Sequence, residues 1–286
     1  MSLAAIVNPQ KESEALAFSY QGEEGKKNLV VQQVILNENE ETIEASNFNT
    51  SEVLKVVDKP EFAVANFGHQ VRVFGFVKHS NKSEKSKIVA AQLSPVFTPI
   101  DNVESIHSPH GNGIAACGHP RDRFGHVFFL VLDNSPCLYH YTLTTTPSAM
   151  RIASKVWKES KLAALHRGGA PWVFYQDHEM LIRVISFGAD EKINTISSAK
   201  AGCHLSALNM EKSGNIDYGV ALCYETKANA VNLVSFKGTW STEESVLSSR
   251  DRDEGTGFSL VGGKDQVYLL YWTKGTLAHK AIDIRD

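Results

Sequence analysis

The sequence contains no long hydrophobic run and no cluster of basic residues. Among its 286 residues, no apolar stretch approaches the roughly 20 residues that span a bilayer. Lysine and arginine are scattered, and a formal net charge of -3 with a pI near 6.4 provides no basic surface for a phosphate backbone or an anionic lipid. We therefore expect neither nucleic acid nor a membrane as a partner.

The signatures of common enzyme classes are also missing. The chain has no P-loop, no G-x-G-x-x-G after a strand, no G-x-S-x-G elbow and no H-E-x-x-H helix. The segment HSPHGNGIAACGHPRDRFGH contains His107, His110, Cys117, His119 and His126, but their spacing matches no structural zinc pattern. We predict no metal site and no cofactor.

Cysteine is scarce, with four residues and no C-x-x-C pair: Cys117, Cys137, Cys203 and Cys223. Each lies in an apolar, strand-like segment, so buried thiols are the default expectation and disulfides the alternative.

The N-terminal residues MSLAAIV lack the basic start and the length of a signal peptide. As written, the chain is expected in the cytoplasm. Two glycosylation sequons, at Asn49 and Asn81, would matter only if a leader had been removed, which keeps the secretory pathway as the alternative.

Helical periodicity is nearly absent, and a strand unit repeats instead. A short strand of small and apolar residues recurs about every 50 residues, in the range of propeller blades, as SLAAI (2–6), EFAVAN (61–66), GIAAC (113–117), KLAAL (161–165), HLSAL (204–208) and GFSLV (257–261). Each copy is followed by a polar turn and two further β-branched or aromatic runs, a pattern typical of antiparallel sheet.

Six such units, arranged radially, can bury both faces of each sheet against its neighbours. We predict an all-β, six-bladed β-propeller of three- to four-stranded antiparallel blades, forming a single domain. The expected blades span residues 2–58, 59–108, 109–158, 159–200, 201–252 and 253–286, the last without an outer strand. A β-sandwich with a second domain is the alternative.

The fourth unit, KLAALHRGGAPWVFYQDHEMLIRVISF (161–187), resembles a blade of the fungal fucose-specific lectins. Phe174, Tyr175, Gln176, Asp177 and Ile182 fit the family pattern without a gap. The resemblance implies a six-bladed propeller with sugar sites between blades. In that family an Arg of the second strand and a Glu of the third bind the sugar hydroxyls, and aromatics of the next blade pack on the sugar. A homodimer is one assembly that the resemblance leaves open.

No unit of this chain retains both charged residues. The Arg position is assigned to Ala17, Arg72, His126, Trp172, Ala221 and Val267, and the Glu position to Val31, Ala90, His140, Val184, Leu233 and His279. Because loss of a charged hydrogen-bonding partner costs about 1.5 to 3 kcal/mol, fucose binding of the family's kind is doubtful at every site.

Two functions from different classes follow. The first is a cofactor-free enzyme that catalyses a cyclisation or a Diels–Alder type cycloaddition on an apolar metabolite, by analogy with fungal cyclising proteins of similar fold. Arg72, His140 and His279 are its candidate catalytic residues, and Trp172, His126, Tyr175 and Trp272 its candidate ligand-binding residues. The alternative is a lectin with altered or lost sugar specificity, and a propeller that serves only as a scaffold is a third option.

Overall fold

The computed structural model describes most of the chain, and every structural statement below concerns the described part. The described ranges are 2–21, 28–36, 42–47, 61–79, 87–94, 98–100, 113–119, 124–132, 135–144, 148–186, 189–212, 215–263 and 266–283. Both sequons, together with His107 and His110, lie outside these ranges.

The described residues form six antiparallel sheets, which confirms the predicted propeller. Blade 1 consists of β1 (Leu3–Asn8), β2 (Lys11–Gln21), β3 (Asn28–Ile35) and β4 (Thr42–Asn47), and blade 2 of β5 (Phe62–Phe67), β6 (Gln70–His79), β7 (Lys87–Ser94) and β8 (Thr98–Pro99). Blade 3 consists of β9 (Ile114–Gly118), β10 (Gly125–Leu132), β11 (Pro136–Leu143) and β12 (Ser148–Ser154).

The second half of the chain repeats this arrangement. Blade 4 consists of β13 (Ala163–Arg167), β14 (Ala170–Gln176), β15 (Ile182–Ser186) and β16 (Ala189–Lys192), and blade 5 of β17 (Leu205–Lys212), β18 (Asn215–Glu225), β19 (Val231–Phe236) and β20 (Glu244–Leu247). Blade 6 has three strands in the described part, β21 (Phe258–Gly263), β22 (Gln266–Thr273) and β23 (Thr276–Ile282).

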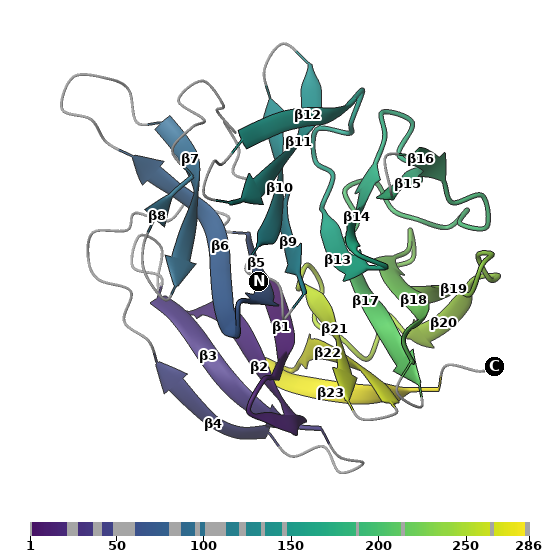
Figure 1. Ribbon diagram of the computed structural model, residues 1–286. Coiled ribbons are helices and arrows are strands. Elements are labelled where there is room, and N and C mark those ends of the chain that lie inside the picture. The colour runs from purple at the N-terminus through teal and green to yellow at the C-terminus, as the bar shows by residue number, and fades with distance from the viewer. Residues whose placement is uncertain are drawn as a thin grey trace.

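The innermost strands form a closed ring around the propeller axis. β1, β5, β9, β13, β17 and β21 each contact the next, and β21 returns to β1 (Figure 1). Serine hydroxyls link neighbouring blades near this ring: the Ala5 amide donates to Ser259 Oγ at 3.0 Å, and the Leu260 amide to Ser206 Oγ at 2.8 Å. The first and last blades are thus joined by non-covalent contacts.

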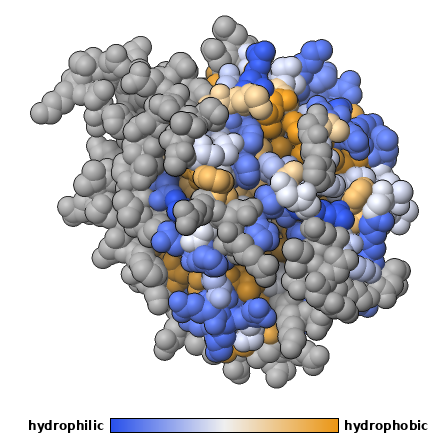
Figure 2. All heavy atoms as spheres, viewed as in Figure 1, coloured by the Kyte–Doolittle hydropathy of each residue, from blue (hydrophilic) through white to orange (hydrophobic). Residues whose placement is uncertain are grey.

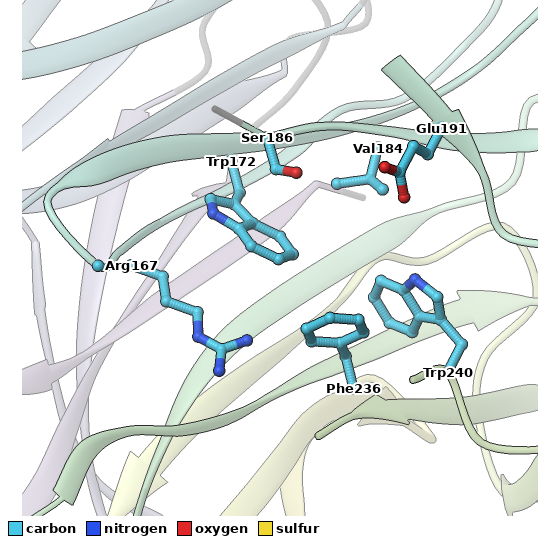
Figure 3. A pocket seen from close by; sticks show the side chains of 8 residues that line it. Arg167, Trp172, Val184, Ser186, Glu191, Phe236 and Trp240 are labelled. Atoms are coloured by element: carbon cyan, nitrogen blue, oxygen red, sulfur yellow. The ribbon is translucent and has the colours of Figure 1, made fainter. Parts of the chain in front are cut away.

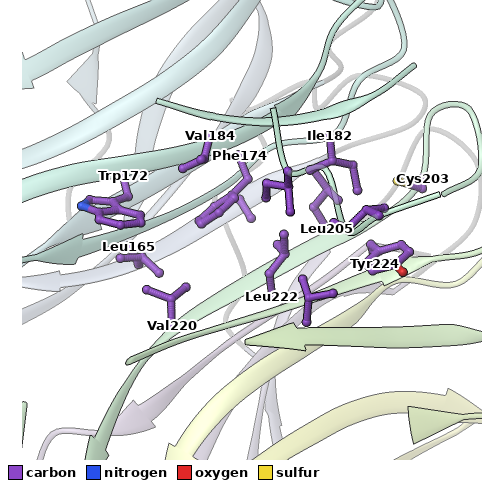
Figure 4. Close-up of a cluster of buried hydrophobic side chains, with 14 residues drawn as sticks. Leu165, Trp172, Phe174, Ile182, Val184, Cys203, Leu205, Val220, Leu222 and Tyr224 are labelled. Atoms are coloured by element: carbon purple, nitrogen blue, oxygen red, sulfur yellow. The ribbon is translucent and has the colours of Figure 1, made fainter. Parts of the chain in front are cut away.

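The hydrophobic core is divided among the seams, where "seam" means the space between two adjacent blades. At the seam between blades 4 and 5, Trp172, Phe174 and Val184 of blade 4 pack against Val220 and Leu222 of blade 5 (Figure 4). Five similar clusters fill the other seams. Complete burial of each large apolar side chain contributes about 1.5–3 kcal/mol, so the seams hold the ring together.

Alternation along each strand decides which seam a side chain enters. On β14, Trp172 and Phe174 face blade 5, whereas Val173 and Tyr175 face blade 3. The space-filling view shows hydrophilic side chains over much of the described surface, with hydrophobic ones exposed in smaller areas among them (Figure 2). A one-residue change in register would therefore move a binding residue into a different seam.

All four cysteines are buried and none forms a disulfide, which confirms the expectation of buried thiols. Burial raises the pKa of the Cys203 thiol to about 12, which keeps this side chain protonated at neutral pH. The described residues include no helix that is long and apolar enough to cross a bilayer.

Candidate functional site

The pairing of strands shows which residues occupy the Arg position of the second strand and the Glu position of the third strand in each blade. These are called the two seam positions below. In blade 4, Phe174 pairs with Val184, so Trp172 and Val184 lie on the face that meets blade 5. The same relationship holds for His126 and His140 in blade 3, where Phe128 pairs with His140. These positions agree with the alignment of the sequence.

Three positions assigned from the sequence are wrong. In blade 1, Ala17 packs toward blade 6, and Leu16 occupies the position beside Val31 at the seam with blade 2. In blade 6, Val267 packs toward blade 5, and Tyr268 occupies the Arg position at the seam with blade 1. Each of these two errors is a one-residue slip, which reverses the face of a strand residue.

The third error is a slip of two residues along β7. Phe74 pairs with Gln92 and Phe76 with Ala90. Both residues of β7 lie on the same face, but Gln92 occupies the position assigned to Ala90. The corrected pairs, from blade 1 to blade 6, are Leu16 with Val31, Arg72 with Gln92, His126 with His140, Trp172 with Val184, Ala221 with Leu233, and Tyr268 with His279.

Arg72 lies at the seam between blades 2 and 3. Its guanidinium is 4.6 Å from the centre of the Phe67 ring, and its Nη1 donates to Gln92 Oε1 at 3.0 Å. A cation on an aromatic face and a charge-assisted hydrogen bond both hold the side chain in place.

The seam between blades 3 and 4 contains a group of histidines. His126 Nδ1 lies 2.9 Å from His140 Nε2, and the His140 ring stacks on Phe128 with centroids 4.7 Å apart. The His166 ring lies 6.0 Å from that of His126 and 5.8 Å from that of His119. Burial lowers the pKa of His140. Within the described ranges, no group of three or more His, Cys, Asp or Glu residues is arranged to hold a metal ion.

The remaining candidates are buried in two seams. His279 is 3% exposed and its ring lies 5.8 Å from that of Tyr268, at the seam between blades 6 and 1. Trp272 belongs to the same apolar cluster. Tyr175 faces blade 3 and donates its hydroxyl to Asp190 at 3.0 Å, and burial raises its pKa. The proposed catalytic residues Arg72, His140 and His279 thus lie at three different seams, and the structure does not bring them together.

A pocket of about 480 Å³ lies at the seam between blades 4 and 5 (Figure 3). Its lining comes from all four strands of blade 4 and, in blade 5, from the end of β19 and the segment that follows it. It comprises Arg167, Gly168, Trp172, Val184, Ser186, Glu191, Phe236 and Trp240. The volume is within the usual range for ligand-binding clefts.

Backbone geometry places the charged residues of the pocket. The turn after Arg167 has positive φ angles at Gly168 (56°) and Gly169 (79°), which glycine adopts without steric cost, and it brings β14 directly back along β13. Glu191 pairs with Val184 across β15 and β16 and is exposed to solvent. Both charged side chains reach the pocket from blade 4.

Aromatic rings form one wall of the pocket and orient the arginine. The Arg167 guanidinium carbon lies 5.5 Å from the centre of the Trp172 ring and 5.4 Å from that of Phe236. Trp172 and Phe236 are 5.6 Å apart, and Phe236 and Trp240 are 5.2 Å apart. The pocket therefore combines an oriented donor, a solvated carboxylate and an apolar aromatic surface.

The same architecture occurs in solved lectin structures. No family model and no curated protein matches the chain. Aleuria aurantia lectin in complex with α-methyl-L-fucoside has a TM-score of 0.68 at 13% identity, covering 98% of this chain and 90% of the lectin. The SapL1 lectin in complex with α-methyl fucoside has a TM-score of 0.66 at 14% identity, covering 99% and 92%.

AofleA of Arthrobotrys oligospora has a TM-score of 0.63 at 10% identity, covering 100% of this chain and 87% of that protein. A further structure of the Aleuria lectin is described as a six-bladed β-propeller with a fucose recognition mode. The chain has the fold of the fucose-specific propeller lectins.

Within this lectin fold, the sequence analysis identified only part of the pocket. Trp172 and Val184 were found through the gap-free match of the fourth unit, whereas Arg167, Glu191 and Phe236 were missed. Arg167 follows the repeated innermost strand directly, and this was an available signal. Glu191 lies on an outer strand that is not part of the repeat, so no pattern pointed to it.

Proposed function

We propose that this protein binds carbohydrate, as a lectin of altered specificity, and that the pocket between blades 4 and 5 is its glycan site. The observation that carries the proposal is the joint presence of Arg167, Glu191 and three aromatic rings in one cleft. Sugar hydroxyls need donors and acceptors, and the C–H face of a sugar ring packs on aromatic surfaces. The lectins of the same fold that were crystallised with fucosides support this function class.

The residues at the two seam positions predict a different sugar preference from those lectins. Trp172 and Val184 replace the charged pair that the resemblance implies, and the charged groups of this pocket come from the first and fourth strands instead. A hydroxyl pattern that suits a closely spaced arginine and glutamate does not suit this arrangement.

Cyclisation of an apolar substrate is less well supported. It would use an apolar wall and one donor, and this pocket contains both, in Trp172 and Arg167. However, two of the similar structures described above are lectins crystallised with fucosides, and the three candidate catalytic residues are distributed over three seams.

A glycan array with fucosylated and non-fucosylated ligands tests the proposal, followed by calorimetry on the ligands that bind. We expect Arg167→Ala to weaken binding by about tenfold to a hundredfold, the effect of removing a charged hydrogen bond. Arg151→Ala is the matched control, because Arg151 is an exposed arginine on β12 of blade 3. A blank array from folded protein would reject the lectin function and make apolar metabolites the next ligands to test.

A further inference from the structure

The two charged side chains of the pocket come from opposite edges of blade 4. Arg167 ends β13, the innermost strand, and Glu191 lies on β16, the outermost one. Three strand spacings separate these strands, about 14 Å between their backbones. Figure 3 shows the guanidinium and the carboxylate at opposite ends of the pocket. Neighbouring hydroxyls of a single sugar ring are too close together to meet both groups.

Two aromatic rings of blade 5 lie between these ends. Trp172 lies beside Arg167 and is only 6% exposed, Phe236 stands between the two indoles, and Trp240 lies on the side of Glu191 (Figure 3). Trp240 is further supported by Phe174, whose ring centre is 6.0 Å away at an interplanar angle of 85°. The partly exposed rings of Phe236 and Trp240 are therefore the stacking platforms, one toward each charged hydrogen-bonding group.

We propose that this pocket binds two consecutive sugar rings of a glycan. One ring packs on Phe236 and accepts hydrogen bonds from Arg167, and the other packs on Trp240 and donates hydrogen bonds to Glu191. This inference rests on the proposed carbohydrate-binding function and specifies the length of the ligand.

Calorimetry with matched sugar series tests the ligand length. The probes are glucose with its β1,4-linked di- and trisaccharide, N-acetylglucosamine with its di- and trisaccharide, mannose with its α-linked disaccharide, and α-methyl fucoside. We expect a disaccharide to bind at least tenfold more tightly than its monosaccharide in one series, with little further gain for the trisaccharide. Equal affinities, within threefold, of a binding monosaccharide and its disaccharide would overturn the inference while leaving the lectin function intact.

If the protein binds none of these sugars and no glycan on an array, both the proposed lectin function and the proposed ligand length are rejected. Variants of Trp240 and Glu191 test whether the second sugar ring packs at that end of the pocket. Trp240→Ala is expected to bring the affinity ratio of disaccharide to monosaccharide close to one, and Glu191→Gln, an isosteric change at an exposed side chain, to reduce the ratio. Trp157→Ala, at a partly exposed tryptophan between β12 and β13 that does not line the pocket, is the matched control. An unchanged ratio in both pocket variants would contradict the assignment.

Discussion

His126 Nδ1 and His140 Nε2 lie 2.9 Å apart on paired strands of blade 3, and the two imidazoles are therefore hydrogen-bonded. This hydrogen bond needs one unprotonated nitrogen as acceptor, so it cannot persist when both rings are imidazolium. The pair occupies the seam positions of blade 3, where its hydrogen-bonding groups face each other.

The stability of the protein should fall as the pH drops below neutrality. Burial lowers the pKa of His140 relative to the unfolded chain, where histidine titrates near 6.5. Since the unfolded state then binds more protons, the contribution of His140 is complete above about pH 6.5 and is lost as the pH falls toward the lower folded-state pKa. Melting temperatures between pH 8 and pH 5 would measure the decline.

His140→Gln should make this decline shallower, because it removes the titrating group. His178→Gln, at an exposed histidine, should leave the slope as in the parent protein. An identical slope for His140→Gln and the parent would show that other groups determine the acid sensitivity.

Breaking the ion pair between Arg252 and Glu225 should lower the free energy of unfolding strongly. The side chains are 1% and 5% exposed, Arg252 Nη1 also donates to the Thr256 carbonyl at 3.2 Å, and Lys200 Nζ is 3.7 Å from Glu225 Oε1. Arg252→Ala leaves a buried carboxylate without its main partner, so we expect a loss of about 3–5 kcal/mol in the free energy of unfolding.

Urea denaturation of the parent protein, Arg252→Ala and two further variants checks this prediction. Glu225→Leu combined with Arg252→Met should recover most of the loss, because both buried charges are then replaced by apolar groups. Arg250→Ala, at an exposed arginine, should change the free energy of unfolding by less than about 0.5 kcal/mol. A loss below 1 kcal/mol for Arg252→Ala would contradict a structural role for the pair.

Gly125→Ala should destabilise the seam between blades 2 and 3. A Cβ at residue 125 would lie 2.5 Å from the ring of Phe67, which is 1% exposed and confined by Phe74 and Arg72. Because that ring cannot move freely, we expect a loss of about 1–3 kcal/mol in the free energy of unfolding. Gly262→Ala is the control, since its Cβ would meet Leu208 at an ordinary 3.5 Å. Similar stabilities of both variants, measured by denaturation, would refute the steric argument.

One glycan should bind per chain. At three other seams the polar residues at the equivalent positions already contact each other, as Arg72 with Gln92, His126 with His140, and Tyr268 with His279. At the remaining two seams the positions hold only aliphatic side chains, with Leu16 and Val31 in blade 1 and Ala221 and Leu233 in blade 5, whereas the seam between blades 4 and 5 has the aromatic Trp172. Calorimetric stoichiometry near one is therefore expected, and a value of two or more would show that another seam also binds sugar.

The sequence analysis succeeded where a feature repeats along the chain. Six copies of a strand unit predicted six blades, because radial packing is the arrangement in which each such sheet covers its neighbours. The gap-free fourth unit also placed Trp172 and Val184 correctly. In blades 1 and 6 the assignments slipped by one residue, since local sequence does not reveal which face of a strand is which.

The pocket depends on relationships that no local pattern contains. Phe236 reaches it from blade 5, and Arg167 and Glu191 reach it from strands that are not adjacent in the sheet. The pairing of Phe74 with Gln92, which places Gln92 beside Arg72, is equally invisible in the sequence.

The amino-acid sequence by itself determined the strand content, the six-fold repeat and the loss of the lectin charge pair, because strand propensity, spacing and residue type are local properties. Only the tertiary structure decided which side chains share a seam. Strand register within blade 4 and the packing of blade 5 against it bring Arg167, Glu191 and Trp240 into one cleft, and such contacts exist only after the blades have packed together.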